Sequence, residues 1–505
     1  MHKPKDSRAT PTPSGYAGRT YPPQVTDKVD ATFSQGVSEQ TTMHFVFINP
    51  NRALARSSIW SVINSITPPI GLALLSALLE HHGHQSQIID AMALNLDVSG
   101  VLSVMDVHTD SIVGITATTP DMDMAVKIAS AVRSRYPHVR LLMGGVHPTI
   151  YHEELVRSGI CDLVIRGEAE GAIVALANEH PLEDIANLTW RTADAQVVQN
   201  PQSNDFADLN TLPMPSYAKL PMRMYHSALG SARRAPSIGM ITSRGCPGKC
   251  TFCFSSMFGS RVRVTAAEGV FEHILHLRSV YGIREISFYD DTFTANRKRV
   301  EQLCNMLIAE GVNISWSCFA RVDTVSPDIL KLMKAAGCHQ IMYGFETVED
   351  DILRAINKKV TSNRYGDVIR WTRDAAIDIR GAFMLGLPGE GPGGMTKTIA
   401  FSKAIDIQFA IFNITTPFPG TALFQWAMDN GYIKHTHWSH YDMAHAVMEL
   451  PCVSAAEVEA AYKRAYREFY LRPRYVLNRL RSISTKEEFL IHLSVLRGIL
   501  SILTR

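Results

Sequence analysis

Short apolar segments alternate with amphipathic segments from Met43 onward. The first apolar segment, His44 to Asn49, has the length of a buried strand, and a helix is predicted over residues 71–80. A second helix is predicted over 122–135, and further strands are predicted at Gln87–Asp90, Ser111–Thr116, Arg140–Met143 and Leu163–Ile165. Strands that alternate with helices at this interval predict a doubly wound, Rossmann-like parallel sheet over residues 42–180. Such a sheet binds ligands at the carboxyl ends of its strands.

A second α/β series follows a linker. Residues 181–235 contain several prolines and show little periodicity, which is typical of an extended linker. Six apolar strands then alternate with helical segments: Ile238–Thr242, Glu285–Tyr289, Ile314–Phe319, Gln340–Tyr343, Gly381–Gly386 and Phe409–Ile414. They predict a full or partial TIM-like barrel of the (β/α)6 type over residues 236–430, with its chemistry where strands end. Residues 431–505 are predicted to be mainly helical, and residues 1–41, rich in Pro, Ser, Thr and Gly, are predicted to be a disordered tail.

Composition narrows the functional classes. The chain has 505 residues, with 50 Lys and Arg against 48 Asp and Glu, so its formal charge of +2 gives no electrostatic reason to expect nucleic-acid binding. The N-terminus has no apolar signal segment, and the longest apolar segments are shorter than the ~20 residues that span a bilayer. We therefore expect a cytoplasmic protein without a transmembrane segment. The arginines of the C-terminal helices and the apolar segment 489–503 leave peripheral membrane contact open.

Three of the eight cysteines lie close together, as Cys246, Cys250 and Cys253. A structural zinc site needs four ligands, normally in two spaced pairs, and no second pair is present. Three thiolates on one tight loop can instead hold three irons of a 4Fe-4S cube, which leaves the fourth iron open to a small molecule. Phe252 within the loop is expected to shield the cube.

The pattern C-x-x-x-C-x-aromatic-C after a first barrel strand resembles the radical S-adenosylmethionine (SAM) enzymes. The resemblance implies that SAM binds at the open iron. It also implies roles for residues at the ends of the next strands. Asp290 and Asp291 would bind the SAM amino group, and Arg321 its carboxylate. Glu346 would contact the ribose and methionine portion, and the segment at Gly386 the adenosine.

The resemblance extends to the N-terminal domain, which looks like the cobalamin-binding domain that precedes the barrel in one branch of that family. The residues that match and would contact cobalamin are Pro69, Gly71, Thr116, Thr118, Gly144, Gly145, His147, Gly167 and Glu168. Many cobalamin domains carry D-x-H-x-x-G after the first strand, and this chain does not. Asp106 and His108 approximate that motif but precede the third strand, so the cobalt is expected to lack a protein His ligand.

These resemblances predict a cobalamin-dependent radical SAM C-methyltransferase. Such an enzyme methylates an unactivated carbon through a 5′-deoxyadenosyl radical and methylcobalamin. A cyclase or rearrangement enzyme of the anaerobic magnesium-protoporphyrin ester cyclase type has the same domain order and stays open, as does a non-catalytic cobalamin-binding sensor. The expected partners are a small-molecule or lipid-like substrate and an external electron donor such as flavodoxin or ferredoxin.

Other residues that suggest chemistry have simpler interpretations. Four histidines, His435, His437, His440 and His445, match no known metal spacing and are expected in a loop or at a substrate rim. Cys318 and Cys338 lie in or beside apolar strands, where buried, inert thiols are common.

Overall fold

The computed structural model describes residues 42–51, 65–203, 205–228, 231–259, 261–435 and 437–482. The predicted tail over 1–41 and the apolar segment 489–503 lie outside the described residues.

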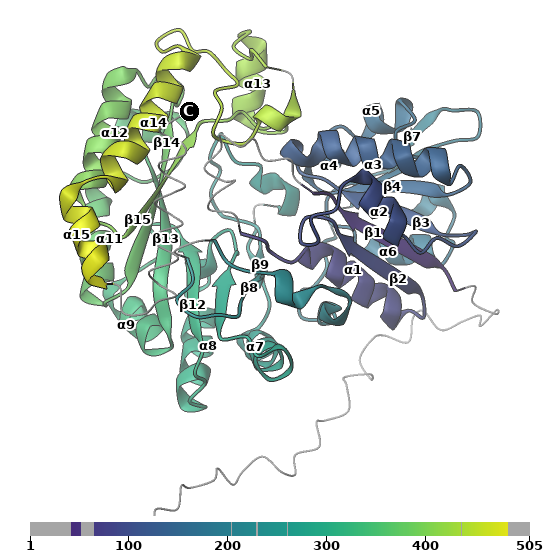
Figure 1. Ribbon diagram of the computed structural model, residues 1–505, viewed down its shortest axis with the longest axis horizontal. Helices are drawn as coiled ribbons and strands as arrows, with labels where there is room; N and C mark the ends of the chain where they lie inside the picture. The colour runs from purple at the N-terminus through teal and green to yellow at the C-terminus, as the bar shows by residue number, and fades with distance from the viewer. Residues whose placement is uncertain are drawn as a thin grey trace, which may run out of the picture. The chain divides into compact units, whose positions relative to one another are not determined.

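The first sheet has the strand order β2-β1-β3-β4-β5-β6-β7 (Figure 1). Its strands are β1 (His44–Asn49), β2 (Gln85–Asp90), β3 (Ile112–Thr116), β4 (Arg140–Gly144), β5 (Leu163–Ile165), β6 (Leu188–Arg191) and β7 (Val197–Gln199). The helices among them are α1 (Ile70–His81), α2 (Val98–Val104), α3 (Met122–Arg135), α4 (Val146–Ile150), α5 (His152–Arg157) and α6 (Glu170–Ala177). The first five strands in this order pair in parallel, which confirms the Rossmann-like arrangement.

Alternation along β1 explains why helices cover both faces of this sheet. Phe45 and Phe47 belong to one buried cluster, with residues of α1 and α6. Val46 and Ile48 belong to a second cluster, with residues of α2, α3 and α5. Successive side chains of a strand point to opposite faces, so a continuous apolar run needs a helical layer on each side.

The predicted linker is partly wrong, because β6 and β7 extend the first sheet. They form an antiparallel hairpin on β5 across the turn 192–196, where the Thr192 N–H donates to the Gln196 carbonyl at 2.9 Å. Strands of four and three residues are too short to show a period-2 pattern among the surrounding prolines.

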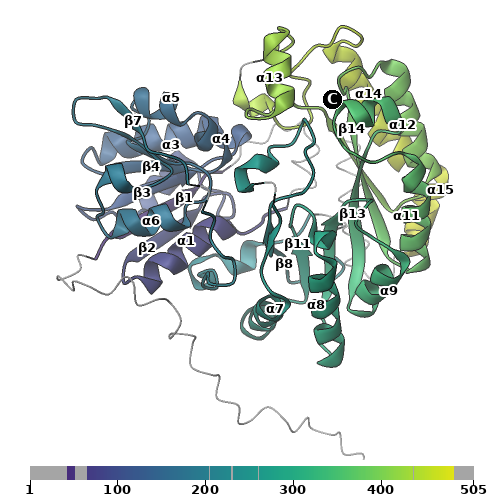
Figure 2. The same ribbon diagram turned by 180° about the vertical axis from the view of Figure 1, so that it is seen from behind.

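The second sheet is wholly parallel, in the order β15-β14-β13-β12-β11-β8, as the barrel prediction requires (Figure 2). Its strands are β8 (Ser237–Met240), β11 (Glu285–Phe288), β12 (Ser315–Ala320), β13 (Cys338–Glu346), β14 (Asp378–Leu385) and β15 (Phe409–Ile414). The helices are α7 (Ala267–Tyr281), α8 (Arg297–Ala309), α9 (Pro327–Ala335), α10 (Asp350–Ala355), α11 (Asn363–Asp374), α12 (Pro392–Ala404) and α13 (Ala422–Asp429). Within the described residues β8 and β15 do not pair with each other, so the barrel is partial.

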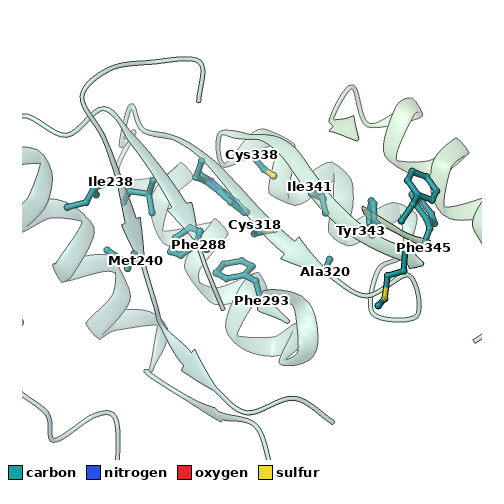
Figure 3. Packing of buried hydrophobic residues seen from close by; sticks show 14 of the residues in the cluster. Ile238, Met240, Phe288, Phe293, Cys318, Ala320, Cys338, Ile341, Tyr343 and Phe345 are labelled. Atoms are coloured by element: carbon teal, nitrogen blue, oxygen red, sulfur yellow. The ribbon is translucent and has the colours of Figure 1, made fainter. Parts of the chain in front are cut away.

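One side of each barrel strand forms the core beneath the helices. Figure 3 shows Phe288, Cys318 and Ile341 from three neighbouring strands in this layer. Cys318 and Cys338 are 2% and 1% exposed and pack among these apolar side chains. They are buried thiols, as expected from their apolar strands.

The free edge of β15 is covered by α14 (Ala455–Tyr470). The Tyr466 hydroxyl donates to the Phe412 carbonyl at 3.0 Å and accepts from the Phe412 N–H at 3.1 Å. The Tyr470 hydroxyl does the same at Ala410, at 2.7 and 3.2 Å. The two tyrosines, one helical turn apart, thus lie opposite alternate residues of the strand. They form hydrogen bonds with backbone groups that would otherwise be unpaired on an edge strand.

The C-terminal region is less helical than predicted. Residues 431–454 contain one short 3-10 turn, Trp438–His440, and isolated bridges, before α14 begins at a capping box of Ser454 and Glu457. The helix α15 (Pro473–Ser482) follows. Several arginines of this region bind the protein itself: Arg472 donates to the Lys403 carbonyl at 2.6 Å, and Arg474 pairs with Asp406 at 3.3 Å. Among the described residues, no helix has the length and apolar character needed to cross a membrane.

The tyrosine pairing predicts a measurable loss of stability. We expect Tyr466→Phe and Tyr470→Phe each to lower the free energy of unfolding by about 1–3 kcal/mol, because each leaves a buried N–H and C=O of β15 unpaired. Urea denaturation measures the change. Tyr432→Phe is the control, since the half-buried Tyr432 ring packs at an angle against Trp426 and its hydroxyl makes no hydrogen bond to the described residues. A loss as large in the control would contradict the assignment.

Candidate functional site

The cysteine loop leaves the sheet at the carboxyl end of β8. It is closed at its base by two short antiparallel strands, β9 (Ser243–Arg244) and β10 (Arg263–Val264). Gly245 begins the loop with a φ of +88°, and a Cβ there would meet the Arg261 carbonyl oxygen at 2.6 Å. Glycine alone therefore fits where the chain turns into Cys246.

The loop is held from outside by the segment after α10. The Thr251 N–H donates to the Ile356 carbonyl at 3.0 Å, and the Asn357 side chain donates to the Lys249 carbonyl at 2.8 Å. Phe252, predicted to shield a cluster, is half-buried and packs against the barrel core.

The three cysteines are accessible and are not arranged for a single metal ion. Cys246 and Cys250 are half-buried and Cys253 is exposed, and none forms a disulfide. Burial raises the pKa of the Cys250 thiol. Within the described residues, only His44, Asp106 and His108 bring three possible ligand atoms within 4.8 Å of one another. The wider spacing of the three sulfurs fits a multi-iron cluster better than a tetrahedral ion.

Two cations lie against the cysteine loop. Arg321 forms a bidentate pair with Asp323 at 2.9 and 2.8 Å and donates to the Lys358 carbonyl at 3.1 Å. A side chain at Gly248 would meet the Arg321 Nη1 at 2.9 Å. Lys358 is the second cation. Burial alone lowers its pKa, but the charges of Glu346 and Cys250 outweigh burial and raise it above the ordinary value.

Glu346 is held in a strained conformation beside Lys358. It ends β13 with a φ of +62°, which is uncommon for a residue other than glycine, and the register to β14 shifts there. Its Oε1 accepts from the Lys358 Nζ at 2.5 Å. A Cβ at Gly344 would collide with that carboxylate oxygen, so the spacing G-x-E in the sequence gives the carboxylate room to fold back.

Asp290 and Asp291 have different surroundings, although the sequence predicts one role for both. Asp290 is fully buried. Its Oδ1 accepts from the Thr242 and Ser243 N–H groups at 2.5 and 3.1 Å, and its Oδ2 from the Thr242 hydroxyl at 2.6 Å and Arg299 at 3.2 Å. These bonds engage the carboxylate in holding the segment that leads into the cysteine loop.

Asp291 is exposed at the mouth of the barrel, near the Gly245 N–H. The loss of solvent around its carboxyl, and secondarily the charge of Asp290, raise its pKa. Of the two carboxylates, Asp291 is therefore the one placed to meet a ligand at the loop.

The segment at Gly386 is shaped by a buried carboxylate. The Glu390 Oε2 accepts from the Gly386 and Leu387 N–H groups at 2.9 and 3.2 Å. Burial raises the pKa of Glu390 to about 7.

A cavity of about 760 Å³ opens at the carboxyl ends of the first sheet. Of the cobalamin-contact residues predicted from the sequence, those that line it are Pro69, Gly71, Thr116, Thr118, Gly144, Gly145, Gly167 and Glu168. Residues on both sides of the cysteine loop also line it: Ile241, Ser243, Arg244, Met257 and Phe258. The glycines expose backbone along its wall, as a large ligand that packs against the main chain requires.

Two charged residues of the first domain pair with arginines that flank the cysteine loop. Glu168 binds Arg244 at 3.1 Å and also pairs with Arg263, and Glu170 binds Arg244 at 2.5 Å. All four side chains are at most 17% exposed. Glu168 thus has a structural partner in addition to its place in the cavity wall.

His147 does not line the cavity. Its ring packs against Tyr151 and Trp438, with centroids 4.7 and 4.9 Å away, and Nδ1 lies 3.3 Å from the Thr119 hydroxyl. Burial lowers the pKa of His147 to about 4, so the ring is neutral. This position fits a loop anchor.

The clustered histidines contact one another as rings, for example His440 with His435 at 5.2 Å and with His445 at 5.5 Å. His445 pairs with Asp442 at 3.0 Å. They are absent from the one potential metal-binding group found in the described part of the chain.

The sequence does not identify Lys358 as a site residue, because a lone lysine after a helix carries no signal of the buried carboxylate that it contacts.

Family models match both parts of the chain. The radical SAM superfamily model matches residues 240–401, and the B12 binding domain model matches residues 57–177.

Individual proteins resemble most of the chain. An uncharacterized methyltransferase of Pyrococcus horikoshii is 35% identical over 427 residues, which are 83% of this chain and 92% of that protein. An anaerobic magnesium-protoporphyrin IX monomethyl ester cyclase of Cereibacter sphaeroides is 26% identical over 85% of this chain and 71% of its own. The structure of the radical SAM methyltransferase TsrM of Kitasatospora setae, with cobalamin and a 4Fe-4S cluster bound, has a TM-score of 0.67 at 15% identity. That match covers 90% of this chain and 99% of TsrM, and it concerns the fold.

The role of Asp290 can be tested by substitution. We expect Asp290→Asn to lower the free energy of unfolding by about 3–5 kcal/mol, because it leaves Arg299 buried without a counter-charge. Chemical denaturation of the apoprotein measures this. Asp351→Asn removes an exposed pair with Arg354 and should change stability by less than about 1 kcal/mol. An Asp290 variant as stable as this control would refute the positioning role.

Proposed function

Since the chain belongs to the family of radical SAM enzymes that carry a B12-binding domain, we propose that it is a methyltransferase acting at an unactivated carbon. One observation carries the proposal: the cavity of the first domain is lined by residues on both sides of the cysteine loop, including Ser243 and Met257. A cofactor in that cavity and a cluster on that loop therefore share a wall. Transfer of a methyl group to a substrate radical needs such proximity.

The residues present suit the three cofactors. Cys246, Cys250 and Cys253 would hold the cluster, and the glycine-lined cavity would hold cobalamin. When bound, the cluster and SAM supply a radical that removes a hydrogen atom from substrate, and cobalamin supplies a methyl group.

Charged groups at the mouth of the barrel would bind SAM. Its methionine end is a zwitterion, which needs a carboxylate for the ammonium and a cation for the carboxylate. Asp291 is the exposed acid beside Gly245, and Arg321 and Lys358 are the cations beside the loop. Glu346, held by Lys358, would accept from the ribose or the ammonium. The Gly386 segment, fixed by Glu390, would contact the adenosine.

Cobalamin would bind without a histidine on cobalt. His273 lines the cavity, but its Nε2 is engaged by the Tyr217 hydroxyl at 2.9 Å. His108, in the sequence that approximates the cobalt motif, stacks on His44 at 4.3 Å, at the amino end of β1. The cavity lies at the carboxyl ends of the strands, so His108 has no part in it.

A cyclase is the second candidate, favoured by the similarity to the Cereibacter sphaeroides enzyme over 85% of this chain. For either reaction we propose a small-molecule substrate and an external electron donor such as flavodoxin or ferredoxin. We also propose a cytoplasmic location, because three thiolates that hold a cluster need a reducing compartment.

Each cluster cysteine should be indispensable. We expect Cys246→Ala, Cys250→Ala and Cys253→Ala each to lose the visible absorption and the iron and sulfide of the reconstituted cluster. Cys452→Ser, at an exposed cysteine away from the loop, should retain both. A loop variant with a full complement of iron and full activity would exclude the assignment.

The reaction class is decided by the products. We expect the reconstituted, cobalamin-loaded protein, incubated anaerobically with SAM, a reductant and substrate, to form both 5′-deoxyadenosine and S-adenosylhomocysteine, as measured by mass spectrometry. If 5′-deoxyadenosine alone forms with a true substrate, methyl groups are not transferred and the cyclase proposal replaces this one.

A further inference from the structure

Arg380 on β14 faces the interior of the partial barrel. Phe383, three residues along the strand, points the other way, because its ring stacks on Phe345 and Phe412 and meets Phe401 of α12. Alternation along a strand therefore places Arg380 on the concave face. Its neighbours in register on that face are Met342 of β13 and Phe409 of β15.

The layer around Arg380 is apolar and aromatic. Phe319 of β12 is next to Met342 in register, and its ring lies 5.5 Å from that of Tyr289. The Arg380 guanidinium lies over the Phe409 ring, 5.7 Å from its centroid. These side chains form a surface that suits an apolar or aromatic group rather than an ion.

Arg380 has no counter-charge in this layer. It is 9% exposed, its Nε is buried without a hydrogen-bond partner, and no carboxylate of the described residues pairs with it. The nearest acid on its own strand, Asp378, is bound by Arg233 at 2.6 Å. Burial lowers the pKa of Arg380, and only tyrosine hydroxyls oppose that effect.

Two other buried arginines, by contrast, have carboxylate partners. Arg299 faces Asp290, and Arg244 faces Glu168 and Glu170. A buried cation without an anion destabilises a fold, so a position that keeps one is expected to receive its anion from a ligand. Farther toward the carboxyl ends, on the same face of β15, the buried Oδ1 of Asn413 also has no donor.

We propose that Arg380 binds a carboxylate of the enzyme's substrate, whose apolar or aromatic part lies against Phe319, Met342 and Phe409. The proposal rests on the proposed function, since it takes the interior of the barrel as the place where the substrate reacts. The planar guanidinium suits a carboxylate, with which it can form two parallel hydrogen bonds. The substrate is then an amphipathic acid with a hydrogen-bond donor farther along, toward Asn413.

The test compares two probes on the full-length, cluster- and cobalamin-loaded protein under anaerobic conditions. The probes are 3-phenylpropionate and its uncharged amide, and binding is measured by ligand-detected NMR. We expect the carboxylate to bind about tenfold more tightly than the amide, as one charge-assisted bond implies. Arg380→Gln should abolish the preference, and Arg380→Lys should retain part of it. Arg233→Gln removes a cation at the base of the same strand and should leave the preference intact.

A preference that survives in Arg380→Gln, or equal binding of both probes to the unaltered protein, would overturn the proposal. Should neither probe bind, the melting temperature of Arg380→Met decides. If Arg380 serves to bind a ligand, Arg380→Met should melt at or above the temperature of the unaltered protein. If Arg380 instead stabilises the fold, the melting temperature of Arg380→Met should fall, and this result would also overturn the proposal. Neither readout requires SAM cleavage or methyl transfer, so a failed methylation assay leaves this test unaffected.

Discussion

The ion pairs between Arg244 and the two glutamates of the first domain fix the distance between the cysteine loop and the cavity proposed for cobalamin. Arg244 precedes Cys246 by two residues, and Glu168 and Glu170 follow the carboxyl end of β5. Buried ion pairs add little net stability, but breaking one is costly, so they act chiefly by fixing geometry. Each of these buried charges is stabilised by its partner instead of by water. The pairs therefore hold the loop and the cavity wall together. The proposed reaction, in which a substrate radical formed near the loop receives a methyl group from the cavity, would depend on that separation.

The positions of the strands could be predicted because their signal is local. In β1, the four consecutive apolar residues at 45–48 require a helix on each face, and this requirement can be seen without knowing the fold. The hairpin of β6 and β7 could not be predicted in the same way, because seven residues in two strands among prolines carry no period. Its stability comes from β5, a tertiary neighbour that the local sequence does not reveal.

The site shows the same division. The spacing of Cys246, Cys250 and Cys253 is a local pattern, so the sequence alone is sufficient to predict a cluster on that loop. The different roles of Asp290 and Asp291 depend on which of two adjacent carboxylates turns toward Arg299, and the backbone after β11 decides that. Lys358 and Arg380 have no motif. Lys358 matters because it pairs with a buried carboxylate, and Arg380 matters because no carboxylate of the described residues pairs with it. Neither fact can be inferred from the type of residue.

Three features of the barrel work against stability. Glu346 has a left-handed backbone, Glu390 is a buried carboxyl with a pKa of about 7, and Arg380 is a buried cation that pairs with no carboxylate of the described residues. Each would be simple to remove by a substitution that favours the fold, so their presence needs a cause outside folding. The first two surround the expected SAM site. Arg380 lies deeper in the same interior, and for this reason we assign it to the substrate.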